Sequence, residues 1–306
     1  MTPVRHTLRG IAAMVASQLA FLLNDTLIKL ASDALPMGEI IFLRGLFASA
    51  LIGAILVATG LHRQLPALWN RMVIWRGIGE LGGTFFYLLA LFHMPIGNAT
   101  IIFQAVPLTA TAGAALFLGE KVSWRRWSAI VIGFLGVLLV VRPGLTGFDA
   151  YGLLVLVSVM FVAMRDLTTR AMPLVIPTVL VTFGTAVLVT LMGAAMGLTE
   201  RWLWPGGTHL LQLAGAGFFL AIGYFTIIAA MRLGDISVTA AFRYVAVVFA
   251  IAIGFMVWGD VPDALTVVGS GIIVGTGLYT FNRARRLRNG AAAEGAAAAA
   301  AVAPPI

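Results

Sequence analysis

Charged side chains interrupt several apolar stretches of this sequence, and two sets of them have helical spacing. Asp25 and Lys29 are four residues apart, and Asp166 and Arg170 repeat that spacing. Residues four apart share one face of a helix, so each acid can reach its base. A charge inside an apolar segment is costly and usually faces a partner or an aqueous cavity. We interpret both pairs either as structural ion pairs that close the helix ends or as gating or coupling groups.

One further cation, Arg243, lies about two turns inside an apolar stretch and is flanked by Phe242 and Tyr244. A planar guanidinium binds a carboxylate through two parallel hydrogen bonds, which suits an amino-acid substrate. Its partner could instead be a protein carboxylate, such as Glu80 or Asp25. We predict that Arg243 is the main substrate-binding residue.

The other predicted substrate-binding residues are polar or aromatic side chains on the same and neighbouring stretches. Glu80 and Tyr87 lie on one helical stripe, and Thr100 and Gln104 form another. Most aromatic side chains in such segments pack against helices or lipid, so only part of the set is expected to touch a substrate. The full set is Arg243, Gln104, Glu80, Tyr87, Phe103, Phe242, Tyr244, Tyr224, Thr100 and Thr239.

The sequence lacks the motifs of several other functions. It contains no cysteine and its four histidines are far apart, so no metal site is expected. The phosphate-binding pattern GxxxxGK(S/T), the zinc-binding pattern HExxH and the nucleophile pattern GxSxG are absent. The net charge is +8, but the basic residues are scattered singly along the chain. We expect no enzyme, no cofactor and no nucleic-acid partner.

The composition predicts an integral membrane protein. Of the 306 residues, 60% are hydrophobic and 10% are charged, whereas about a quarter are charged in an ordinary soluble domain. The mean hydropathy is +1.00. A water-soluble fold could not bury so much apolar surface, so a lipid bilayer is the expected surroundings.

Ten apolar stretches are candidates for transmembrane helices, which need roughly 20 residues each. Their continuous runs of Leu, Ala and Gly favour helices over the alternating pattern of a β-barrel. We expect an all-α integral membrane protein with spans at 8–31, 38–60, 73–94, 97–118, 127–142, 151–171, 177–198, 209–231, 236–258 and 264–281.

Basic residues are concentrated in alternate connections between these spans. Cytoplasmic connections of membrane proteins are rich in Lys and Arg. Both termini are therefore predicted to be cytoplasmic, with Glu200 outside, in a cell inner membrane. The Ala-rich tail, residues 286–306, is expected to be disordered.

The two halves of the sequence match each other. The spacing between matched residues is nearly constant, at 139 to 141 residues, for Asp25 with Asp166, Lys29 with Arg170, Pro36 with Pro177, Thr100 with Thr239, Phe103 with Phe242, Gln104 with Arg243 and Gly119 with Gly259. An odd number of spans in each half, five, would turn the second half upside down in the membrane. We predict an inverted repeat with domains at 1–145 and 146–285, a substrate site near the midplane and alternating access.

Residues 105–144 resemble the fourth and fifth helices of the EamA family of the drug/metabolite transporter (DMT) superfamily. That family has a proline inside a helix, a run that ends in Gly-Glu, a basic loop and a last helix with spaced glycines. Here those positions hold Pro107, Gly119, Glu120, Gly133 and Gly136, and Arg44 matches an arginine common in the second helix. The resemblance covers roughly residues 10–283, but the second half has Ala246 in place of Pro107 and Asp260 in place of Glu120.

The resemblance implies a ten-helix transporter, similar in length and layout to YddG-type amino-acid exporters. The expected function is secondary transport that exports amino acids or related small metabolites by alternating access. A drug or nucleotide-sugar carrier of the same superfamily is the alternative. A channel would be expected to show a filter loop or charge rings, and a membrane enzyme would need convergent catalytic groups.

Overall fold

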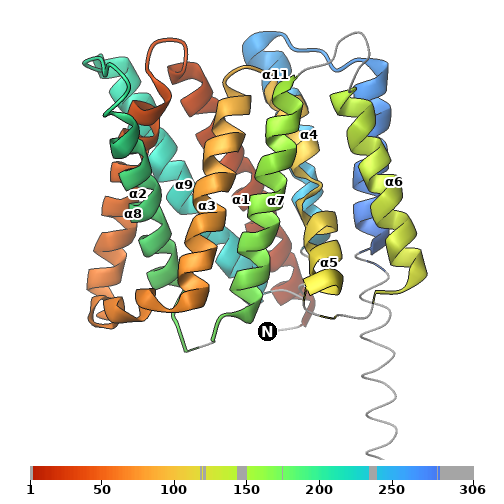
Figure 1. The fold of residues 1–306 in the computed structure, drawn as a ribbon, viewed down its shortest axis with the longest axis horizontal. Helices are drawn as coiled ribbons and strands as arrows, with labels where there is room; N and C mark the ends of the chain where they lie inside the picture. Colours follow the sequence, from red (N-terminus) through yellow and green to blue (C-terminus); the bar gives the residue numbers. More distant parts are fainter. Residues whose placement is uncertain are drawn as a thin grey trace, which may run out of the picture.

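Helices make up nearly all of the described chain in the computed structural model, which describes residues 3–117, 119, 122–142, 150–173, 175–233, 240–280 and 282. Most of them run between two opposite ends of the molecule (Figure 1). In chain order they are α1 (Pro3–Ala31), α2 (Met37–Ala58), the 3₁₀ helix η1 (Leu61–Trp69), α3 (Arg71–Leu91), α4 (Ile96–Phe103), α5 (Val106–Phe117), α6 (Trp124–Val141), α7 (Ala150–Ala171), α8 (Thr178–Met196), α9 (Gly207–Leu233), η2 (Ala240–Tyr244) and α11 (Val245–Trp258). A further apolar helix covers Ala264–Thr280.

Seven helical segments are long and apolar enough to cross a membrane. They lie in α1, α2, α4 with α5, α6, α7, α8 and α9, and two shorter apolar helices cover Phe242–Trp258 and Ala264–Thr280. Helix α3 has 21 residues but includes Arg76 and Glu80, which lower its hydropathy. The predicted all-α membrane fold is confirmed, whereas the count of ten spans and the inverted repeat remain predictions.

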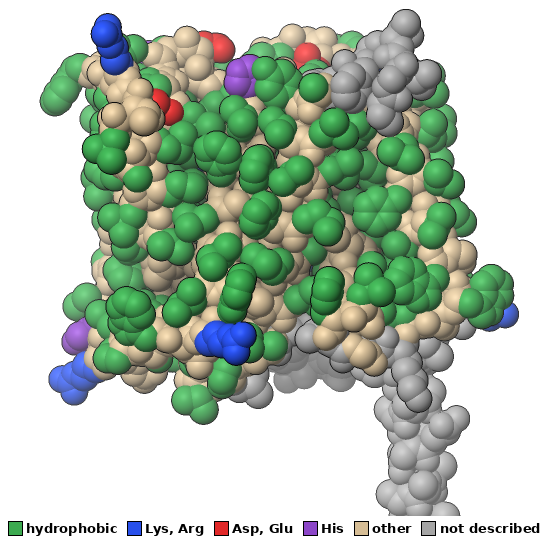
Figure 2. Space-filling model, in the orientation of Figure 1, with side chains coloured by type: hydrophobic (Ala, Val, Ile, Leu, Met, Phe, Trp, Pro, Cys, Tyr) green, Lys and Arg blue, Asp and Glu red, His purple; other side chains and the backbone are tan. Residues whose placement is uncertain are grey.

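The surface has the distribution of polarity that a bilayer requires. Figure 2 shows hydrophobic side chains over the middle of the visible face, with Lys and Arg at its upper and lower edges. Trp69 and Trp204, near helix ends, are 84% and 95% exposed. Amphipathic aromatic rings at such positions suit the boundary between lipid and water.

The three first helices each pack against a helix from the second half of the chain. Helix α1 packs mainly against α9, α3 against α7, and α2 against α8 and α9. The pairs α2 with α8 and α3 with α7 are also visible side by side in Figure 1. Residues far apart in the sequence are therefore brought together in the interior.

Glycines allow α3 to approach α7 closely. A Cβ on Gly79 would lie 2.8 Å from the Phe161 carbonyl oxygen, and one on Gly82 would lie 2.4 Å from the Phe161 ring. The Ser158 hydroxyl donates to the Gly83 carbonyl over 2.8 Å. Small residues and interhelical hydrogen bonds are the usual means of helix association in lipid, where the hydrophobic effect does not drive it.

The predicted span 97–118 is not one continuous helix. Helix α4 ends at Phe103, and α5 begins after a turn at Gln104 and Ala105. Pro107 has no N–H for the Phe103 carbonyl, and its ring clashes with that carbonyl in a regular helix. In the turn, the Ala105 N–H donates to the Ile102 carbonyl over 3.0 Å. The proline thus explains the interruption.

The predicted span 236–258 is also divided, with the 3₁₀ turn of η2 leading into α11. Its first residues, 236–239, lie outside the described chain. Ala246 stands where the first half has Pro107, so no proline accounts for η2. Both interrupted helices place backbone groups in the interior of the bundle.

We expect Gly79→Ala to destabilise the protein by about 1–3 kcal/mol, because overpacking forces backbone shifts. The added Cβ would meet backbone atoms of α7 at Phe161 and Arg165, 2.8 and 2.9 Å away. The thermal midpoint of detergent-purified protein should fall. Gly275→Ala is the matched control, because nothing lies within 4 Å of its Cβ position. Equal midpoints for the two variants would contradict the close packing of α3 on α7.

Candidate functional site

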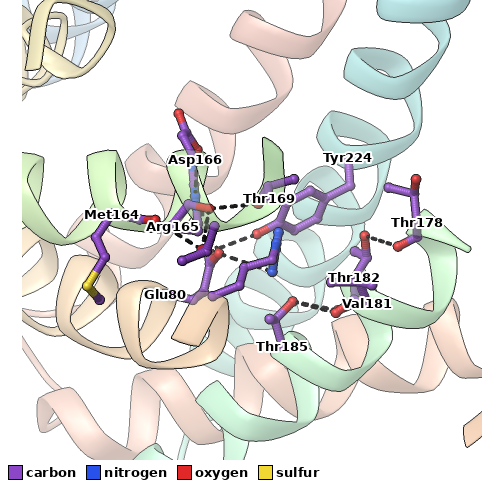
Figure 3. Close-up of polar contacts among 12 residues, drawn as sticks. Glu80, Met164, Arg165, Asp166, Thr169, Thr178, Val181, Thr182, Thr185 and Tyr224 are labelled. Atoms are coloured by element: carbon purple, nitrogen blue, oxygen red, sulfur yellow. Dashed lines mark hydrogen bonds and ion pairs between the residues drawn. The ribbon is translucent and has the colours of Figure 1, made fainter. Parts of the chain in front are cut away.

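A cluster of buried ionisable side chains lies where α3, α7 and α9 meet (Figure 3). On α7, the Arg165 guanidinium donates to Glu80 Oε2 over 3.3 Å and to Asp166 Oδ1 over 2.9 and 3.0 Å. The Tyr224 hydroxyl of α9 donates to Glu80 Oε1 over 3.3 Å. Arg76, one turn before Glu80 on α3, lies 3.8 Å from Oε2. Glu80 is only 8% exposed, and these groups compensate its charge.

The partner of Asp166 in this cluster is the preceding residue, Arg165. The predicted partner, Arg170, has a side chain outside the described residues, so the predicted pair remains a prediction. Arg165 was not among the predicted site residues. Its position beside Asp166 in an apolar stretch was the signal that could have identified it.

A second polar cluster lies between α1 and α3. Asp25 accepts a hydrogen bond from the Tyr87 hydroxyl over 2.9 Å and another from Asn24 Nδ2 over 2.8 Å. The Tyr87 ring in turn lies 4.9 Å from the Phe103 ring of α4. Two predicted substrate-binding residues and one predicted coupling residue therefore meet here, through neutral donors rather than an ion pair.

Lys29 points to the end of α3 instead of to Asp25. Its Nζ donates to the Leu91 and Met94 carbonyls over 2.6 Å each and lies 5.5 Å from the centre of the Trp258 ring. The last carbonyls of a helix lack partners within it and favour a cation. The expected contact between Asp25 and Lys29 is replaced by these separate contacts, because the carbonyl oxygens of the last α3 residue and of Met94, just after the helix, satisfy the ammonium group.

The interrupted helices bring Gln104 and Arg243 together. Gln104 is 6% exposed, and its Nε2 lies 3.5 Å from the Arg243 carbonyl oxygen. Thr100, one turn earlier on α4, is also buried. The Arg243 Nε is buried and has no hydrogen-bond partner among the described residues. Neither Glu80 nor Asp25, the protein carboxylates considered for Arg243, has an ion pair with it in the described chain.

The remaining predicted residues differ in their surroundings. Tyr244 is 5% exposed and packs against the helix Ala264–Thr280, where a Cβ on Gly277 would lie 1.8 Å from its hydroxyl. Phe242 is 38% exposed. Thr239 lies outside the described residues. The contact with Gly277 gives Tyr244 a packing role between helices.

Arg44 on α2 is a buried cation that the predicted site did not include. It is 5% exposed, and no hydrogen bond or ion pair links its guanidinium to another described residue. It lies within electrostatic range of Asp25, Tyr224 and Glu80. An arginine inside an apolar stretch was the available signal, and at Arg44 it indicated only a family resemblance.

A cavity of about 170 Å³ lies away from these clusters, at one end of α4, α6 and α11. None of the predicted substrate-binding residues lines it. The Arg142 guanidinium bonds to Asp263 at its rim. With the Thr266 N–H, it lowers the pKa of that exposed carboxyl to about 2. The ion pair therefore persists at neutral pH and is lost only as the pH falls toward 2.

We expect Arg165→Gln to destabilise the protein by about 3 kcal/mol, because it leaves the buried carboxylate of Glu80 and the partly exposed carboxylate of Asp166 without their guanidinium. Adding Glu80→Gln should recover part of that loss, since a carboxamide needs no counter-charge. Thermal midpoints of the wild type, both single variants and the double variant would measure the coupling. Strict additivity of the two substitutions would show that the contact of 3.3 Å between Arg165 and Glu80 contributes nothing.

Comparisons with known proteins find matches in both family and fold. The model of the EamA-like transporter family matches residues 8–142. One solved crystal structure matches with a TM-score of 0.60 and 23% identity, over 90% of this chain and 98% of that one. At this identity, the structural match shows the fold alone.

Relatives named as transporters match nearly the whole chain. The pseudopaline exporter of Pseudomonas aeruginosa is 28% identical, over 87% of this chain and 93% of the relative. The S-adenosylmethionine uptake transporter of Rickettsia conorii is 24% identical, over 92% of this chain and 95% of the relative. The riboflavin transporter of Vibrio cholerae is 27% identical, over 90% of this chain and 93% of the relative. These relatives are transporters of small molecules and not enzymes. The first half of the chain, residues 8–142, is thus similar to the EamA-like transporter family, and relatives of the DMT superfamily match nearly the whole chain.

Proposed function

We propose that this multi-pass transporter exports amino acids or related zwitterionic metabolites across the inner membrane by alternating access, as a YddG-type carrier would. Its relatives are named for three chemically different metabolites, in both export and uptake. They support small-metabolite transport, and the choice of amino acids depends on the chemistry of the interior.

Buried groups of both signs carry this proposal. Asp25 supplies a carboxylate whose hydrogen-bond donors are neutral, and Arg243 has a buried Nε without a partner among the described residues. A zwitterion carries both charges and therefore needs both kinds of partner. The guanidinium geometry suits its carboxylate, and a protein carboxylate suits its ammonium group.

The same mixture of positive and negative groups disfavours a nucleotide-sugar carrier, which is the alternative function with the same fold. A diphosphate would call for several unpaired cations close together. In the Glu80 cluster, Arg76 and Arg165 are already engaged with carboxylates, and Lys29 is engaged with carbonyls. Arg44 and Arg243 each have a buried Nε that lacks a bonded partner among the described residues, and they do not form the larger cluster that a ligand with several negative charges would need.

Alternating access is supported by contacts between matched residues of the proposed inverted repeat. A twofold axis exchanges the two members of a matched pair, so matched residues that touch must lie close to the axis. The Ser49 and Thr190 hydroxyls, 141 residues apart in sequence, lie 3.3 Å apart. Gln104 reaches the Arg243 carbonyl at a separation of 139 residues.

Helix pairing and caps are consistent with the same repeat. The match exchanges α1 with α7 and α3 with α9, and the main contacts are α1 with α9 and α3 with α7. Pro36 and Pro177 precede α2 and α8 with similar extended backbone angles. Gly119 and Gly259, also matched, both have positive φ, at 67° and 72°.

We expect Arg243→Gln to abolish most amino-acid counterflow while expression and detergent stability stay near the wild-type level. The substitution copies the matched residue Gln104 and removes the proposed carboxylate anchor. Proteoliposomes loaded with amino acids, sugars or nucleotides would measure counterflow of each labelled solute. Arg243→Lys retains the charge but loses the planar fork, so intermediate transport is expected.

Counterflow by Arg243→Gln at the wild-type rate would rule out the anchor role. Failure of the variant to fold would favour a structural role for the guanidinium. If the wild type moves sugars or nucleotides but not amino acids, the alternative carrier replaces the proposed function.

The proposed orientation, with both termini in the cytoplasm, can be tested in this cysteine-free chain. Glu200 accepts a hydrogen bond from the Gly38 N–H over 2.8 Å, so the neighbouring exposed Arg201 is the better site for a probe. An impermeant maleimide added to intact cells should label Arg201→Cys and not Arg63→Cys. The reverse pattern would invert the topology.

A further inference from the structure

The Arg44 guanidinium is the most deeply buried cation without a bonded partner in the described chain. The residue is 5% exposed, and its Nε is buried without a hydrogen bond. A guanidinium has five N–H donors and cannot be deprotonated in a protein. Burying such a group without partners is strongly unfavourable unless water or a ligand supplies acceptors.

The nearest carboxylates are already bonded to other groups. Both oxygens of Asp25 accept hydrogen bonds, from Asn24 and Tyr87. Both oxygens of Glu80 are also engaged, by Tyr224 on one side and by Arg165 and Arg76 on the other. Arg44 therefore interacts with these acids only over a longer range, and its donors are available to another anion.

Close helix packing holds the backbone of Arg44 in place. A Cβ on Gly217 of α9 would lie 2.9 Å from the Arg44 carbonyl oxygen, and one on Gly45 would lie 2.4 Å from the Thr190 hydroxyl of α8. Helix α2 is thus fixed between α8 and α9 at this level. A binding group on a rigid element keeps its geometry without a ligand, which is favourable for recognition.

Arg44 and Arg243 lie at different depths. Asp25 lies six residues before the end of α1, and Arg44 lies seven residues after the start of α2. At 1.5 Å per residue, both are about 10 Å from the same end of the bundle. Helix α11 ends at the same end of the bundle, because its last residue, Trp258, contacts Lys29. Arg243 precedes the first residue of α11, so the whole length of that helix lies between Arg243 and this end. Arg243 is therefore roughly twice as far from this end as Arg44 is.

We propose that Arg44 is an anion-binding residue of the transport path and that its ligand is a carboxylate of the transported molecule. This inference rests on the proposed function and deepens it: the carboxylate meets two guanidiniums in turn, at the depths of Arg243 and Arg44. Each Asp25 oxygen retains a free lone pair, so an ammonium group can bind Asp25 while the carboxylate binds Arg44. The aromatic pair Tyr87 and Phe103 lies beside Asp25, which favours an aromatic amino acid as a probe.

A stability comparison tests this proposal without transport. Arg44 is buried and the Arg165 side chain is 22% exposed, but only Arg165 has bonded carboxylate partners. In the full-length purified protein, Arg44→Gln should leave the thermal midpoint unchanged or raise it, whereas Arg165→Gln should lower it by several degrees. An equal fall for both variants would show that Arg44 holds the fold, and would overturn the proposal.

Binding of a small carboxylate is the second measurement. Acetate should raise the midpoint of the wild type more than acetamide does at equal ionic strength, since ligand that binds only the folded state stabilises it. Arg44→Gln should lose this difference, and Arg44→Lys should retain part of it. No difference between acetate and acetamide in the wild type would overturn the proposal.

Counterflow in proteoliposomes separates this inference from the proposed function. Wild-type protein should exchange L-phenylalanine and not its carboxamide. Arg44→Gln should lower the exchange rate of L-phenylalanine by about tenfold or more, which corresponds to the loss of one charge-assisted hydrogen bond. Wild-type rates for Arg44→Gln would overturn the role of Arg44 and leave amino-acid export standing. Acetate binding that depends on Arg44, without exchange of any amino acid, would support the anion site and contradict amino-acid export.

Discussion

The interior of this protein is organised by the cost of placing charge in an apolar medium. Glu80 is the clearest example, because three side chains from α3, α7 and α9 converge on its two oxygens. Removing any one of them leaves the buried Glu80 carboxylate with one partner fewer. The same constraint accounts for Lys29, whose ammonium group is held by one carbonyl at the end of α3 and one just after it. Helices that carry such groups must keep fixed positions relative to one another, and glycines allow the close helix packing that this requires.

Much of the helix layout was predictable because hydropathy and proline placement are local signals. The predicted starts and ends agree closely with α2, α7 and α8, since Gly, Pro and polar residues separate them in the sequence. The interruption after Phe103 also has a local cause in Pro107. The turn of η2 has no proline to mark it, so a sequence pattern could not locate it.

The contacts of the candidate site were less predictable. Helical spacing predicted that Asp25 would meet Lys29, but spacing within one helix contains no information about neighbouring helices. Tyr87 comes from α3 and satisfies Asp25, while the end of the same helix supplies carbonyls to Lys29. Arg44 was missed as a site residue for a related reason, because the absence of a bonded partner is visible only once the surrounding helices are in place.

The meeting of Gln104 with Arg243 has an evolutionary consequence if the two halves arose by duplication, as the proposed repeat implies. In an ancestral homodimer of identical five-helix subunits, the residue at this position would have faced its own copy across the twofold axis. Arginine there would set two guanidiniums against each other, and glutamine would supply no charge. Joining the halves in one chain permits a different residue on each side of the axis, here Gln104 and Arg243. Gene fusion would then be the step that allowed a charged centre to form.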